Sequence, residues 1–297
     1  MGGKDRVLGV RTLILEGRGE QLNFGQNHTP SADTKYEVTS VRRVFDFANK
    51  RWYLDLTREP RFVTSNMAPQ RQRSGLDGDV AYNVAPNGAM SRAAAPIATD
   101  RAYDFLYHPV GLLQAALAPG AEVFEEAAPN NMRLIRTTPG GNKFAMLVDT
   151  RTNLPARIER MVYQPMLGDV MLVNEFGDWQ DVGGMKLPMR WTQRYENLFT
   201  LADFRLTCRI NEEAGDIAAS DSIRAATPGG PAGPLPAPTI VVDTLAPGVW
   251  AIAGQSHHTI AIEQSNQIVL VESPQSDARA LAAIAKSREL RPGKAPT

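Results

Sequence analysis

Two adjacent histidines, His257 and His258, are the residues whose type and spacing come nearest to metal chemistry. They precede a strand-like run, and neighbouring residues of a strand point to opposite faces, so the two imidazoles are poorly placed to share one ion. A catalytic zinc site needs three protein ligands, whereas the other histidines, His28 and His108, are isolated. We therefore expect no metal site, no cofactor and no catalytic residue within this chain. The expected role of His257 or His258 is to line a cleft or to support the ligands of a complete site.

Glu272 is the third residue of this candidate site. It ends the apolar run "IVLVE" immediately before Ser273-Pro274 and an expected helix start. Two roles stay open for its carboxylate. It either orients metal ligands in a complete site, or it stabilises the N-terminus of the helix through the helix dipole.

The composition excludes several classes of protein. Among 297 residues, Lys+Arg and Asp+Glu are both 32, and the short basic groups "VRRVF" and "RQR" form no basic stripe, so we expect no nucleic-acid partner. No apolar run is long enough for a transmembrane helix, and the N-terminus has no recognisable signal peptide. The single cysteine, Cys208, alternates with apolar residues in "FRLTCRI", which indicates a buried small hydrophobe.

Most of the chain from Leu8 to Ile210 alternates between apolar and polar residues, as β-strands with one buried face do. Turn residues at Asn49-Lys50, Asp77-Gly78 and Gly183-Gly184 predict tight hairpins. One interruption, "TDRAYDFLYHPVGLLQAALAPG", has helical spacing and predicts two short helices, the second with Pro109 in its first turn. The expected fold class is α+β, with an antiparallel sheet curling over helices.

The apolar residues expected to face inward on this sheet are the candidates for an apolar ligand face. The main candidates are Trp52, Phe105, Leu112, Leu113, Trp179 and Trp191. Four further candidates are Leu54, Met161, Met171 and Met189. Core packing is the simpler role for such residues, because methionine and aromatic side chains fill cores routinely.

A break in composition separates this region from the C-terminus. The segment "AATPGGPAGPLPAP" is almost entirely Ala, Gly and Pro and is typical of a linker. We expect one domain over residues 1–212, a linker over 213–238 and an incomplete domain over 239–297. The last part has several short strands and a helix over about 275–290, and it is small for an independent core.

The C-terminal part resembles the opening of the metallo-β-lactamase fold, which has an αββα architecture. The resemblance is carried by "APGVWAIAG", by "TIAIE" after Ser256, by "IVLVESP" with Glu272, and by a helix ending near "RPGK". It implies a zinc hydrolase acting on a small-molecule substrate, whose His-x-His-x-Asp-His motif would follow this chain. The chain is then expected to be an inactive fragment, with zinc only in an intact form and with self-association through its incomplete C-terminal sheet.

The N-terminal part resembles LolA-like half-barrels, in particular the accessory domain that precedes some bacterial metallo-β-lactamase-fold hydrolases. The residues that carry this resemblance are in "LILEGRG", "GLDGDVAYNV", "TNLPARIERMVY" and "FGDWQDVGGMKLPMRW". It implies a curved sheet over helices and a periplasmic or secreted location. The alternative to the hydrolase is a carrier-like module that binds a lipid or another hydrophobic ligand without catalysis.

Overall fold

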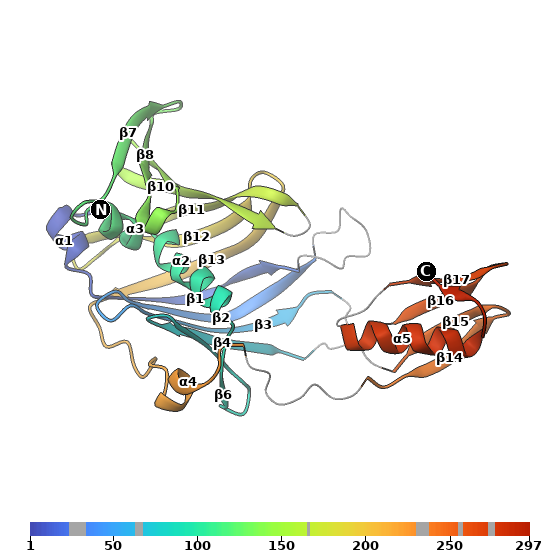
Figure 1. Cartoon of the computed structure of the whole chain (residues 1–297). Helices are drawn as coiled ribbons and strands as arrows, with labels where there is room; N and C mark the ends of the chain where they lie inside the picture. The colour runs from blue at the N-terminus through green and yellow to red at the C-terminus, as the bar shows by residue number, and fades with distance from the viewer. Residues whose placement is uncertain (24–33, 63–67, 165–166, 230–237, 255–257, 273–276) are drawn as a thin grey trace. The chain divides into compact units, whose positions relative to one another are not determined.

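Hairpin-connected strands dominate the structure, a computed structural model that describes residues 1–23, 34–62, 68–164, 167–229, 238–254, 258–272 and 277–297. The chain divides into two compact units, Met1–Gly230 and Pro231–Thr297 (Figure 1). The helices of the first unit are α1 (Lys4–Leu8), α2 (Ala95–Tyr103), the 3-10 helix η1 (Asp104–Tyr107), α3 (Pro109–Ala116), the 3-10 helix η2 (Pro139–Gly141) and α4 (Asp221–Ala225).

In the described part of the first unit, a single antiparallel sheet of 13 strands has the order β6-β5-β4-β3-β2-β1-β13-β12-β11-β10-β9-β8-β7. The strands in the first half of the chain are β1 (Thr12–Leu22), β2 (Lys35–Asp46), β3 (Arg51–Pro60), β4 (Gln70–Asp77), β5 (Val80–Val84) and β6 (Met90–Arg92). The others are β7 (Val123–Ala128), β8 (Met132–Thr137), β9 (Phe144–Asp149), β10 (Leu154–Gln164), β11 (Gly168–Val182), β12 (Met185–Tyr195) and β13 (Phe199–Ile210).

Two runs of neighbouring strands make up this sheet. The strands β1 to β6 pair in sequence order, as do β7 to β13, and the pairing of β1 with β13 joins the two runs, with Leu13 opposite Ile210 and Gln21 opposite Ala202. The predicted hairpins are confirmed. Val182 pairs with Met185 across Gly183-Gly184, and both glycines have positive φ (60° and 80°), as the tight primed turns of hairpins require.

The helical segment Ala95–Ala116, formed by α2, η1 and α3, lies against one face of this sheet, which we call the inner face (Figure 1). Its second helix begins at Pro109, as predicted, because proline has no N–H that a first helical turn would need to pair. Tyr107, Val110 and Leu112 are buried with inner-face residues such as Phe45 and Trp191 in one hydrophobic core. Period-two alternation in the strands supplies the apolar side of this core.

The opposite face of the sheet, the outer face, is covered in part by the segment that follows β13. Ile217 packs on Ile14 and Val44, and Ala219 and Ile223 pack on Val80 and Tyr82. The Tyr82 hydroxyl donates to the carbonyl of Ile217 over 2.7 Å. The same face carries many charged side chains.

The second unit has its own sheet and one described helix. Its strands are β14 (Val241–Ala246), β15 (Val249–Ala253), β16 (Thr259–Glu263), β17 (Gln267–Val271) and β18 (Ala295–Pro296), in that order, and β18 pairs parallel to β17. The helix α5 (Asp277–Leu290) packs Ala283 against Trp250, Ile252, Ala261 and Ile268.

The predicted fold class is wrong. The structure is mostly β, with one wide antiparallel sheet in place of a half-barrel over helices, and the second unit is not the start of an αββα fold. The alternation of apolar and polar residues predicts which residues form strands and which face is buried. It does not predict which strand pairs with the edge of each run. The pairing of β1 with β13 connects residues about 200 positions apart and makes the two runs into one sheet.

Candidate functional site

Arg43 is the charged residue that β2 places on the apolar inner face. Val41 and Phe45 flank it at a spacing of two residues, so all three side chains share a face. The Arg43 guanidinium lies over the indole of Trp191, with 4.6 Å between its Cζ atom and the ring centroid. Burial lowers the pKa of Arg43, which the charge of Asp104 partly offsets. Its Nη1 atom is buried and has no hydrogen-bond partner among the described residues.

His108 contacts the same indole from the junction between η1 and α3. Its ring centroid is 5.8 Å from that of Trp191, and the side chain is 1% exposed. Nδ1 accepts a hydrogen bond from the backbone N–H of Val110 over 3.3 Å, which caps α3. Burial, together with the charge of Arg43, lowers the pKa of His108 to about 3. The imidazole is therefore neutral at pH 7 with its proton on Nε2, a buried donor for which the described structure supplies no acceptor.

Asn174 of β11 completes this group of polar residues. Its Oδ1 atom accepts from Trp191 Nε1 over 2.9 Å and from Gln193 Nε2 over 2.8 Å, which fixes the orientation of the amide. The side chain is fully buried, and its Nδ2 donor is unpaired within the described part of the chain. Trp52, which pairs with Phe45 across β3 and β2, has a similarly unpaired Nε1 donor.

These four unpaired atoms have the same chemical character, because each is a donor. Buried polar atoms of proteins are nearly always hydrogen-bonded, so four unpaired donors beside one hydrophobic core require an explanation. Arg43, Asp104, His108, Asn174 and Trp191 are hereafter called the Trp191 cluster. Burial raises the pKa of the Asp104 carboxyl to about 6, against the lowering effect of Arg43 and Arg101, and Asp100 raises it further.

Polar contacts attach the helical segment to its surroundings at several points. Arg101 donates to the carbonyl oxygens of Gly75 and Tyr82 over 3.0 and 2.7 Å, and to Asn83 Oδ1 over 2.6 Å. Gln114 donates to the carbonyl oxygens of Val7 and Val10 over 2.9 and 2.8 Å. Helix α2 contains no buried residue. The α2 end of the cover is thus attached largely by side-chain hydrogen bonds, whereas η1 and α3 are anchored by buried residues.

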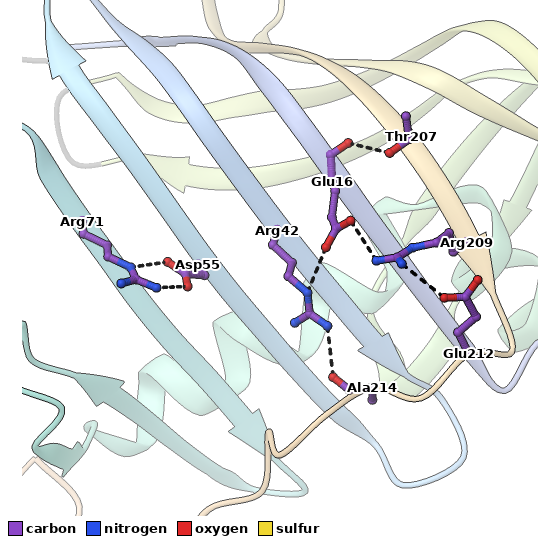
Figure 2. Close-up of polar contacts among 8 residues, drawn as sticks. All are labelled: Glu16, Arg42, Asp55, Arg71, Thr207, Arg209, Glu212 and Ala214. Atoms are coloured by element: carbon purple, nitrogen blue, oxygen red, sulfur yellow. Dashed lines mark hydrogen bonds and ion pairs between the residues drawn. The ribbon is translucent and has the colours of Figure 1, made fainter.

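The outer face carries a different arrangement of charge, shown in Figure 2. Glu16 accepts from Arg42 over 3.1 Å and from Arg209 over 2.8 Å. Arg42 also donates to the carbonyl of Ala214 over 3.2 Å. Asp55 and Arg71 form a two-fold hydrogen bond at 2.8 and 2.6 Å beside a hollow of about 350 Å³. The four charged side chains that line this hollow, Glu16, Arg42, Asp55 and Arg71, are thus paired with one another.

The structure describes two of the three polar residues of the predicted site. His257 lies outside the described residues, and His258 and Glu272 are both exposed in the second unit. Glu272 has a positive φ of 74° at the end of β17. Among the described residues, no three His, Cys, Asp or Glu side chains are grouped as a metal site would need. None of the described helices has the length and apolarity needed to cross a membrane.

The predicted apolar ligand face lies in the core of the first unit. Trp52, Leu112 and Trp191 are almost fully buried there, and Phe105, Leu113 and Trp179 are partly buried against the same core. Met161 was expected to face inward and is 52% exposed, because it has the opposite parity to the buried Ile158 in β10. Sequence analysis missed Arg43, Asp104 and Asn174. Arg43 had one usable signal, its alternation with Val41 and Phe45 in "VRRVF".

Comparisons with known proteins give structural similarity only. No family model matches the chain, and no curated protein matches it. The chain is similar to the crystal structure of a LolA superfamily protein from Nitrosomonas europaea, at 10% identity and a TM-score of 0.41, over 73% of this chain and 96% of that one. It is similar to a DUF1329 family protein from Desulfovibrio piger at 10% identity and a TM-score of 0.37, over 73% and 91% of the two chains.

A porin-like protein from Bacteroides uniformis has a TM-score of 0.21 at 5% identity, over 68% of this chain and 98% of that one. With TM-scores below 0.5, we base no functional conclusion on these similarities. The metallo-β-lactamase resemblance has no counterpart among these proteins.

Proposed function

We propose that the first unit is a binding module that takes up an apolar small molecule, such as a lipid, on the inner face of its sheet beneath the helical segment. The observation that carries this proposal is the way in which the hydrophobic core is covered. The core is rich in aromatic and methionine side chains, and η1 and α3 bury Tyr107, Val110 and Leu112 in it, whereas α2 contributes only partly buried side chains such as Ala98 and Tyr103. Hydrogen bonds from Arg101 and Gln114 hold the two ends of this cover.

Such a cover opens at a modest cost in free energy. A hydrogen bond exposed by opening is exchanged for one to water, and its net contribution to stability is only about 1 kcal/mol. The apolar surface uncovered on the inner face costs about 25 cal/mol per Å² unless another apolar surface replaces it. A ligand with an apolar body replaces that contact, so binding and opening of the cover favour each other.

Two measurements on the full chain test this proposal. The first is mass spectrometry of organic extracts of the purified protein, which we expect to contain an apolar molecule. The second is titration with N-phenyl-1-naphthylamine, an uncharged probe whose fluorescence rises in apolar surroundings. We expect saturable binding, quenching of the fluorescence of Trp52, Trp179 and Trp191, and displacement of the probe by uncharged lipids.

The variant Arg101→Met sharpens the test, because it removes three hydrogen bonds of the cover. We expect probe association to become faster by about tenfold, which corresponds to weakening the closed state by one or two hydrogen bonds. The matched control is Arg71→Met, which removes an arginine from the outer face and should leave the association rate unchanged. Clean extracts and a linear, non-saturable fluorescence response would overturn the proposal.

The remaining expectations stay predictions. A periplasmic or secreted location, self-association through the second unit, and a zinc requirement of a longer protein each need their own experiment. The proposal for the first unit depends on none of them.

A further inference from the structure

We infer that the Trp191 cluster receives the head of the ligand, and that this head is a carboxylate. This inference rests on the proposed function, since it names the polar end of a molecule whose apolar body lies on the inner face. It assigns a chemical class to the ligand, an amphiphile with a single negative charge.

The first support is the donor chemistry around the indole of Trp191. Arg43, His108 and Asn174 each contact this side chain, by a cation–π contact, a ring contact and a hydrogen bond respectively. Each also keeps one buried donor without an acceptor in the described structure. His108 and Asn174 are 1% and 0% exposed, so bulk water does not reach their side chains. Oxygen atoms of a ligand supply the acceptors that all three donors need.

The second support is the charge of the site. A guanidinium binds a carboxylate through charge-assisted hydrogen bonds, and the buried Nη1 atom of Arg43 has no acceptor among the described residues. His108 is neutral, so it adds a donor but no second positive charge. The other charged groups near Asp104 are Arg101 and Asp100, both in α2. Arg43 and Arg101 balance Asp104 and Asp100, so the cluster is close to neutral without a ligand. The single charge of a carboxylate can be offset by protonation of Asp104, whose pKa is about 6, whereas the double charge of a phosphate monoester cannot.

The third support is the contrast with an arginine that has a structural role. Arg42 is adjacent in sequence, and it donates both to Glu16 and to the carbonyl of Ala214. An arginine that only stabilised the fold would gain most from such contacts. Arg43 instead lies buried with an unpaired nitrogen, which is the behaviour of a group kept for a ligand at some cost in stability.

The test compares two displacers of N-phenyl-1-naphthylamine that share one apolar body, dodecanoate and dodecanol, at neutral pH. For the unaltered chain we expect dodecanoate to bind at least about tenfold more tightly than dodecanol, because of charge-assisted hydrogen bonds to the head. In Arg43→Met the two affinities should become equal, with dodecanol unaffected. Arg43→Lys keeps the charge and should retain part of the preference. Arg42→Met is the matched control and should keep all of it.

The outcomes separate this inference from the proposed function. Equal binding of the two displacers to the unaltered chain overturns the carboxylate site and leaves an apolar binding module. The donors of Arg43, His108 and Asn174 would then form hydrogen bonds to buried water and not to a ligand. Absence of binding by probe and displacers alike overturns the proposed function as well. Displacement of dodecanoate by inorganic phosphate at comparable concentration would overturn the carboxylate assignment in favour of a phosphate head. If Arg43→Met does not fold, His108→Asn replaces it and should lower the preference for dodecanoate, because asparagine keeps an acceptor for the Val110 N–H but does not reach the position of Nε2.

Discussion

Arg42 and Arg43 are neighbours in the sequence, and β2 places them on opposite faces of one sheet. On the outer face, Arg42 has a carboxylate and a carbonyl as acceptors. On the inner face, Arg43 contacts an indole and faces Asp104, and one of its nitrogens has no acceptor in the described structure. The same residue type thus has two protein acceptors on one face and a buried, unpaired nitrogen on the other.

This difference separates two uses of charge. The outer face is crossed by ion pairs such as Arg190 with Asp203 and Arg209 with Glu16, whose hydrogen-bonding groups satisfy one another. The inner face has buried donors whose partners are missing from the described protein, and this weakens the fold locally. At neutral pH, the ion pairs of the outer face should therefore contribute to stability, whereas the unpaired donors of the inner face should contribute to binding.

The largest expected effect is the change in unfolding free energy at acidic pH that the buried groups of the inner face produce. His108 has a folded-state pKa of about 3, below its ordinary value of 6.5, so its contribution to stability is lost as the pH falls below 6.5. Asp104 has a folded-state pKa of about 6, above its ordinary value of 3.8, so it has the opposite sign and loses stability as the pH rises from 3.8 to 6. At about 1.4 kcal/mol per pH unit, each effect amounts to roughly 3 kcal/mol at pH 4, and the two nearly cancel.

Single substitutions remove this cancellation. Between pH 7 and pH 4, Asp104→Asn should lose about 3 kcal/mol more unfolding free energy than the unaltered chain, and His108→Asn should lose about 3 kcal/mol less, because of the pKa shifts just given. Urea unfolding at a series of pH values measures both. Asparagine at position 108 keeps an acceptor for the Val110 N–H. If the unfolding free energies of the unaltered chain and the two variants changed in parallel with pH, neither Asp104 nor His108 would be buried as described.

A smaller effect is expected at the buried carboxylate of the outer face. Asp77 accepts from the Ala219 N–H over 2.9 Å and from Arg51 over 3.1 Å, and it forms an ion pair with Arg224. Burial alone would raise the pKa of Asp77, but these hydrogen bonds lower it on balance. Its contribution to stability is therefore present at neutral pH and is lost as the pH falls through the lowered pKa.

We expect Asp77→Ala to lower the free energy of unfolding by about 2 kcal/mol at pH 7, because it leaves the Ala219 N–H unpaired. Chemical denaturation measures this loss. The segment after β13 should also detach, which hydrogen exchange at Ile217 and Ala219 would detect. Asp203→Ala, on the same face but further from that segment, is the control and should leave this exchange unchanged.

Local features of this fold were accessible from the sequence. Alternation and turn residues predicted the hairpins, and Pro109 marked the start of α3, because these features depend on residues close together in the chain. The pairing of β1 with β13 was not predictable in this way, since nothing in the residue types of Leu13 and Ile210 indicates that they pair with each other. The wide sheet, and with it the fold class, depended on that choice.

The candidate site shows the same limit. Residue type identified Trp52 and Trp191 as candidates. The structure places both in the core, and Trp191 is a member of the cluster named after it. Asn174 could not be found, because its role depends on Trp191 of the neighbouring strand and on Gln193. Arg43 could have been found, since a charged residue at an apolar parity within a strand is a local signal of a buried charge.

The two adjacent arginines give a direct comparison of stability. Arg42→Met should lower the free energy of unfolding by about 1 kcal/mol, because Glu16 and the carbonyl of Ala214 each lose a donor. Arg43→Met should lower it by less than this, because removal of a buried, incompletely paired guanidinium offsets the loss of the charge facing Asp104, whose pKa of about 6 lets the carboxyl take up a proton. Thermal unfolding in the absence of ligand distinguishes the two. A loss of stability in Arg43→Met larger than that in Arg42→Met would mean that Arg43 has a structural role.

The smallest effect is expected at Asp55 and Arg71, the ion pair beside the hollow on the outer face (Figure 2). Arg71 is exposed, so water and salt screen its charge, and its two-fold hydrogen bond to Asp55 costs side-chain entropy to maintain. Asp55→Asn should lower Tm by about 2 °C or less, and this difference should vanish at high ionic strength. A larger loss that persists in salt would mean that the hollow contributes to the fold through packing. If Asp55→Asn instead altered ligand affinity, binding would not be confined to the inner face, and the contrast between Arg42 and Arg43 would no longer divide stability from binding.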